Sequence, residues 1–101
     1  MDTTTTHTFD FEQAFTTLQG VVKRTPLEYN AGLSLKYNAN IYLKREDLQI
    51  VRSYKLRGAY NKISGLTADQ LKNGVVCASA GNHAQALAFA AQHFGVPCRI
   101  F

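Results

Sequence analysis

Residues 75–94 read VVCASAGNHAQALAFAAQHF, an apolar run that passes through a short polar loop into an alanine-rich segment. The run at 75–79 has the length and composition of a strand that is buried on both faces, as in parallel sheets. A helix is expected over 82–94, because Gly95 and Pro97 follow it and few of its residues are polar. We expect this helix to be buried against a sheet.

Further elements are predicted on both sides of this stretch. IYLKRE at 41–46 alternates apolar and polar residues like a strand, a helix is expected over 54–64, and VPCRIF at 96–101 begins a further strand. Thr67 to Gln70 forms a capping box that opens a short helix ending near 73–74. The order strand, helix, strand, helix, strand indicates βαβ units and a parallel sheet, so the fold class is α/β.

The N-terminal third gives weaker signals. A helix is expected over 10–20, with Asp10 near its cap, and 24–27 should be extended because Pro26 restricts the residue before it. Residues 32–40 fit either a short helix or a loop.

The loop at 79–83 is the first candidate site. Ligands of parallel sheets bind beyond the carboxyl ends of the strands, and backbone N–H groups at a helix start favour an anion. Gly81 permits close approach because it has no Cβ, and Asn82 and His83 offer side-chain donors. The alternative is structural: Ser79 and Asn82 can serve as helix caps, and His83 can be an ordinary surface or core histidine.

Lys55 is the second candidate, within KREDLQIVRSYKLRG at 44–58. With Ser53 as the N-cap, Lys55 lies in the first helical turn, where the backbone dipole disfavours a cation. A neutral amine can form a Schiff base with a carbonyl compound. The alternative is a solvated surface lysine.

Composition limits the classes of function. The chain has 101 residues with 46% hydrophobic and 18% charged residues, which is ordinary globular usage. The net charge is +4, but long basic tracts for nucleic acid are absent, and the basic group around Lys55 suits an anionic small molecule.

No apolar stretch could span a bilayer, no secretory signal is visible, and no metal-ligand cluster occurs. Cys77 and Cys98 are expected to be reduced, buried strand residues of a cytoplasmic protein.

The motifs KREDLQ (44–49), SYKLRGA (53–59) and SAGNHAQ (79–85) stand in one order that resembles the threonine dehydratase branch of the pyridoxal-phosphate enzymes. The resemblance covers about residues 20–101. It implies the tryptophan synthase β-subunit fold, a three-layer parallel sheet with helices on both faces. Residues 1–20 would be a tail and first helix, and 21–101 the N-terminal part of the catalytic domain, truncated at Phe101. The family's glycine-rich phosphate loop and its partner to the pyridine nitrogen would then lie beyond Phe101.

The resemblance also implies the roles of individual residues. Lys55 matches the lysine that holds pyridoxal phosphate, and Asn82 the asparagine that hydrogen-bonds the cofactor's ring hydroxyl. Tyr54 stands where the family usually has a phenylalanine packed near the cofactor ring. The substrate carboxylate would bind the loop made of Ser79, Ala80, Gly81, Asn82 and His83.

The implied activity is β-elimination from L-threonine to 2-oxobutanoate and ammonia, the first step of isoleucine biosynthesis, with Lys55 also removing the Cα proton. The partners would be an amino-acid substrate and, at full length, further copies of the chain, without nucleic acid or membrane. A serine dehydratase or serine racemase is the alternative, although serine racemases commonly carry serine where this chain has Ala80. Leu56 argues against the cysteine and threonine synthase branches, which tend to have an acidic residue there. A non-catalytic module that binds anions or amino acids is a third possibility, since the 101-residue fragment by itself is expected to be catalytically incomplete.

Overall fold

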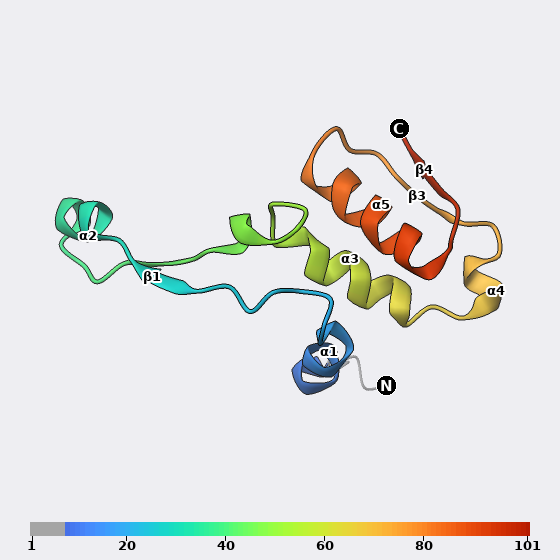
Figure 1. Cartoon of the computed structure of the whole chain (residues 1–101), viewed down its shortest axis with the longest axis horizontal. Coiled ribbons are helices and arrows are strands. Elements are labelled where there is room, and N and C mark those ends of the chain that lie inside the picture. Colours follow the sequence, from blue (N-terminus) through green and yellow to red (C-terminus); the bar gives the residue numbers. More distant parts are fainter. Residues whose placement is uncertain (1–7) are drawn as a thin grey trace, which may run out of the picture.

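The computed structural model describes residues 8–101 and divides into a packed part and an arm (Figure 1). The arm, residues 27–44, consists of β1 (Leu27–Tyr29), α2 (Ala31–Tyr37) and β2 (Tyr42–Lys44). The packed part contains the remaining elements: α1 (Phe11–Leu18), the 3-10 helix η1 (Glu46–Leu48), α3 (Lys55–Ser64), α4 (Ala68–Leu71), β3 (Val75–Cys77), α5 (Asn82–Phe94) and β4 (Cys98–Ile100).

The two strand pairs differ in direction, which corrects part of the predicted topology. β3 and β4 are parallel, with Val75 opposite Cys98, and α5 is the helix that connects them. β1 and β2 are antiparallel, with Leu27 opposite Lys44, so the strand expected at 41–46 does not join β3 in a parallel sheet. Residues 8–101 therefore form an α/β structure, in which a three-layer parallel sheet is not present.

Three helix ends lie where local signals in the sequence predict them. α5 spans Asn82–Phe94, and Gly95 follows in the left-handed region at φ +66°, with its N–H donated to the carbonyls of Ala91 and Gln92. At α4, Thr67 Oγ1 accepts from the Gln70 N–H at 3.2 Å, and the Thr67 N–H donates to Gln70 Oε1 at 2.9 Å. The predicted capping box is thus confirmed, and Asp10 caps α1 through the N–H of Gln13. α2, at Ala31–Tyr37, overlaps most of the 32–40 region that was left open between helix and loop.

The core lies where α3 and α5 face each other. Ala86 and Ala90 of α5 are fully buried at 0% exposure, and these small side chains let the two helices approach closely. α1 adds Leu18, and the strand residues Val75, Cys77 and Cys98 pack against the same cluster. α5 is buried as predicted, but its main partner is α3 and the strands contribute less.

The outer face of β3 is open. Val76 is 68% exposed, so within residues 8–101 the strand is not buried on both faces as predicted. Cys77 and Cys98 lie on the inner face, free and half-buried, and burial raises the pKa of the Cys98 thiol, with a smaller contribution from Cys77. Among the described residues no helix has both the length and the apolar character needed to cross a membrane. No three side chains in residues 8–101 form a metal-binding group.

Candidate functional site

The two candidate motifs lie at one end of a helix pair. Lys55 is the first residue of α3 and Asn82 is the first residue of α5. The helices pack side by side, and Figure 1 shows that they run in the same direction. Their N-termini, where each helix dipole is positive, are therefore at the same end. This packing brings Lys55 and Asn82, which are 27 positions apart in the chain, to one side of the molecule.

α3 does not begin as the sequence predicts. Its N-cap is Tyr54, at φ −70° and ψ −15°, and no side chain caps it. Ser53 precedes the cap by one residue and is 7% exposed, and its Oγ has no hydrogen-bond partner among the described residues. The prediction that Ser53 caps the helix is wrong, because its hydroxyl accepts no N–H group from the first turn of α3.

Lys55 is half-buried at this helix start. Its Nζ makes no hydrogen bond and no ion pair with any of residues 8–101. Tyr54 is 65% exposed, and its hydroxyl has no partner in the same range. The amine is thus held near the protein surface without being engaged by a carboxylate.

The loop before α5 has both a structural role and free donors. Ser79 Oγ accepts from the N–H groups of Gly81 at 3.2 Å and Ala84 at 3.3 Å, so Ser79 acts as a local cap, one of the two alternatives for this residue. The N-cap itself is Gly81, and Asn82 is already helical. The N–H groups of Asn82 and His83 have no acceptor within residues 8–101. Two unpaired donors at a helix start favour an anion.

Space is available beside these donors. A Cβ built on Gly81 would meet no heavy atom within 4 Å, so a ligand can approach the backbone there. The side chains of Asn82 and His83 are exposed. No hydrogen bond joins Lys55 to the 79–83 loop, so the structure places the two motifs at one end of the helix pair without direct contact.

The sequence does not predict a polar network near the start of α3, formed by the side chains of Glu46, Gln49 and Arg57. Gln49, 0% exposed, bonds both backbone groups of Lys23, and Glu46 links Gln49 to Arg57 of α3. KREDLQ belongs to the motifs quoted above, but no individual role is predicted there for Glu46, Gln49 or Arg57. Gln49 lies in a connection without apolar periodicity, so no pattern indicated its burial.

A cavity of about 450 Å³ lies elsewhere in the described part and contains none of the predicted site residues. It adjoins the network through Glu46 and Arg57, and its other lining residues are Phe15, Leu18, Gln19, Val22, Lys23, Arg24 and Lys44. At the helix starts, the side chains of Tyr54, Asn82 and His83 are exposed, so the candidate site is open to solvent within residues 8–101.

Comparison with known proteins gives one consistent family. Residues 18–101 match the family described as pyridoxal-phosphate dependent enzyme. The biosynthetic L-threonine dehydratase of Bacillus subtilis is 57% identical over 89 residues, which is 88% of this chain and 21% of that protein. The chain therefore spans about a fifth of the length of the curated relatives it matches.

Solved structures support the same fold. The processed form of threonine deaminase isoform 2 from Solanum lycopersicum is 42% identical with a TM-score of 0.71, covering 91% of this chain and 28% of that chain. Serine racemase from Dictyostelium discoideum is 35% identical with a TM-score of 0.79, covering 88% and 29%. The threonine deaminase has the higher identity, whereas the serine racemase has the higher TM-score. The fold of this region therefore does not distinguish the two activities.

Proposed function

Because the chain belongs to the pyridoxal-phosphate dependent enzymes, we propose that the protein deaminates L-threonine to 2-oxobutanoate and ammonia, the first step of isoleucine biosynthesis. The proposal rests on the similarity to threonine dehydratases and on one structural observation. That observation is an unpaired, half-buried Lys55 amine at the same end of the helix pair as two unpaired N–H groups.

The residues at this end fit the cofactor. An aldehyde requires an amine that no carboxylate has engaged, and Lys55 has no such partner in residues 8–101. The Ser53 hydroxyl is buried without a hydrogen bond, and an additional polar group at this site would satisfy it. Gly81 leaves open space beside the free donors of α5.

Each residue then has a defined task. Lys55 would hold the cofactor through its amine, and the free amine would take the proton from the substrate Cα. Asn82 would bond the cofactor's ring hydroxyl, and Tyr54 would pack beside the ring. The loop formed by Ser79, Ala80, Gly81, Asn82 and His83 holds the substrate carboxylate through its N–H groups and side chains. Pyridoxal phosphate, when bound, spreads the negative charge that develops at Cα.

The wider setting follows from the same family. We infer that residues 1–20 are a tail and first helix and that 21–101 form the N-terminal part of the catalytic domain. In the complete protein β3 and β4 would belong to a larger parallel sheet with helices on both faces, which would cover Val76. The proposed protein is a cytoplasmic homo-oligomer that binds a small amino acid and neither nucleic acid nor membrane.

The test uses the complete protein loaded with pyridoxal phosphate and supplied with L-threonine. We expect formation of 2-oxobutanoate and ammonia in equal amounts, and a visible absorption band that Lys55→Ala removes together with the activity. Lys62→Ala is the matched control, because Lys62 lies in the last turn of the same helix. A Lys55→Ala protein that keeps the band and the turnover would rule out the proposed role of Lys55.

Serine racemisation is the second candidate, favoured by the TM-score of 0.79. Ala80 argues against it, because alanine has no hydroxyl to act as an acid or base. Turnover of L-threonine, L-serine and D-serine by the same preparation separates the two activities. Dominant interconversion of L- and D-serine would replace the dehydratase proposal.

A further inference from the structure

α3 starts at the most important residue of the proposed site without any side-chain cap. The turn before it contains Arg52 in the left-handed region at φ +62°, with its N–H donated to the Gln49 carbonyl at 2.9 Å. A helix start of this kind frays easily unless other contacts hold it. The contacts that hold it come from the side chains of Glu46, Gln49 and Arg57.

Gln49 is the most deeply buried member of this network. Its Oε1 accepts from the Lys23 N–H at 2.9 Å, and its Nε2 donates to the Lys23 carbonyl at 2.8 Å. The same Nε2 donates to Glu46 Oε2 at 2.7 Å, so both amide hydrogens are used. At 0% exposure this side chain has no water to replace a lost partner. The pairing ties η1 and the turn before α3 to the segment that follows α1.

Glu46 connects Gln49 to α3, because its carboxylate bonds both Gln49 and Arg57. Its Oε1 accepts from Arg57 Nε at 2.7 Å and lies 2.6 Å from Arg57 Nη2, while Oε2 is held by Gln49. The Glu46 side chain is only 14% exposed, which favours a defined geometry over a fluctuating surface pair. Arg57 Nη2 also donates to the Lys23 carbonyl at 3.4 Å.

Arg57 follows Lys55 by two positions, and side chains at that spacing point away from each other on a helix. The network therefore contacts the first turn of α3, through Arg57, on the side opposite the Lys55 amine. Glu46 balances the Arg57 charge without approaching the amine, which stays unpaired among residues 8–101.

We propose that Glu46, Gln49 and Arg57 are positioning residues that fix the first turn of α3 and so aim the Lys55 amine at the cofactor. This inference rests on the proposed function, since it concerns the same amine. A displacement of about 1 Å at a reacting atom can lower a rate by about 100-fold. Loss of the network should therefore slow the reaction of Lys55 with pyridoxal phosphate more than it weakens substrate binding.

The experiment measures how fast cofactor-stripped complete protein forms a borohydride-reducible pyridoxyl adduct on Lys55, followed by mass analysis of the lysine peptides. Glu46→Gln and Gln49→Met are expected to slow adduct formation by about 10- to 100-fold. In steady state their kcat for L-threonine falls while KM changes little. Arg57→Lys keeps the charge but loses the planar contact, and it should be slowed as well.

Asp47→Asn is the matched control. It removes a neighbouring carboxylate whose partner is Arg45, in an exposed pair that does not touch α3. Its adduct formation should stay within about twofold of the unmodified protein, as expected for an exposed ion pair. All rates are taken well below the unfolding temperature of every variant, so that loss of folded protein does not imitate misplacement. Should Glu46→Gln fail to fold, Gln49→Met and Arg57→Lys provide the test.

The outcomes separate the two proposals. An unmodified protein that forms no adduct on Lys55 overturns the proposed function and, with it, this inference. Normal labelling of the unmodified protein together with equally fast labelling of the folded network variants overturns the positioning role alone. Slowing that disappears at lower temperature shows a contribution to stability only, and likewise overturns it.

Discussion

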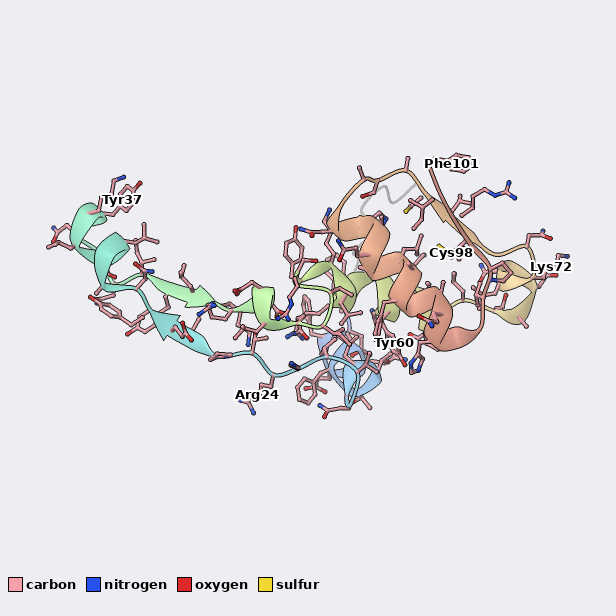
Figure 2. The ribbon with its side chains drawn as sticks, turned by 45° about the horizontal axis from the view of Figure 1, so that its top comes forward. Arg24, Tyr37, Tyr60, Lys72, Cys98 and Phe101 are labelled. Atoms are coloured by element: carbon pink, nitrogen blue, oxygen red, sulfur yellow. The ribbon has the colours of Figure 1, made fainter. Side chains whose placement is uncertain are left out.

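The packed part and the arm use similar residues with opposite results. Leu56 in α3 is 0% exposed, whereas Leu35 in α2 is 87% exposed. Tyr37, at the far tip of the arm, is 61% exposed, whereas Tyr60 in the packed part is 7% exposed (Figure 2). The difference arises because α3 and α5 cover each other, whereas the strand pair and short helix of the arm form a single layer. A single layer cannot bury its apolar side chains. The candidate site belongs to the packed part, where the helices that carry it bury each other's apolar side chains.

The largest expected contrast is between leucines of the two regions. Leu56→Ala should lower the free energy of unfolding by about 2–5 kcal/mol, because it leaves a cavity at a fully buried position of α3. Leu35→Ala in the 101-residue chain should change it by less than about 0.5 kcal/mol. Urea unfolding of both variants measures the difference. Equal costs for the two substitutions would contradict the distinction between a packed part and an open arm.

Two glycines test how tightly the strand pair is joined. Gly74 has φ +84°, and a Cβ there would lie 2.5 Å from the Pro97 carbonyl oxygen. Gly74→Ala combines backbone strain with overlap and should cost about 2–4 kcal/mol. At Gly95, φ +66° imposes strain but no atom lies within 4 Å, so Gly95→Ala should cost about 1–2 kcal/mol. Thermal unfolding that ranks Gly95→Ala as the more harmful substitution would argue against the β3–β4 geometry.

The α4 capping box predicts a smaller effect. Thr67→Ala removes the hydroxyl that accepts from the Gln70 N–H, and should cost about 1 kcal/mol. Ser64→Ala is the control, since its exposed hydroxyl bonds only the Asn61 carbonyl of its own helix. Denaturant midpoints at constant slope give both values. A Thr67→Ala variant as stable as Ser64→Ala would show that the box does not stabilise the packed part.

The smallest effect concerns the exposed charges where the arm joins η1. Hydrogen bonds from Arg45 lower the pKa of Asp47 below its ordinary value. The pairing therefore stabilises the folded state above the ordinary pKa of the carboxyl, and this contribution is lost as the pH falls through the lowered value. Asp47→Asn should be slightly less stable than the unmodified protein at pH 7 and equal to it at strongly acidic pH. A stability difference that grows as the pH is lowered would contradict the assigned direction.

The accuracy of the sequence-based predictions follows the range of the interactions involved. α5, its Gly95 terminus and the Thr67 box were predicted correctly because each depends on residues a few positions apart. The direction of β2 was wrong because alternation shows that a strand exists but not which strand it pairs with. Burial of Val76 on both sides was wrong for residues 8–101 because apolar composition does not specify what covers each face.

The same limit applies to the site. The sequence identified Lys55 and the 79–83 loop, and the packing of α3 on α5 brings both helix starts to one end. Ser53 is of a residue type that favours helix caps, but its hydroxyl accepts no N–H group of α3, and residue type alone does not decide that contact. Gln49 was missed because its partner is the backbone of Lys23, a contact across 26 positions that no local pattern reveals.

Identification of the lysine that carries the cofactor tests the central claim most directly. The complete protein is reduced with borohydride in the presence of pyridoxal phosphate, digested, and analysed by mass for the site of the pyridoxyl group. We predict a single adduct on the peptide that contains Lys55, with Lys62 of the same helix unmodified. An adduct on Lys62 or on another lysine, with Lys55 unmodified, would contradict the assignment of the site to the start of α3.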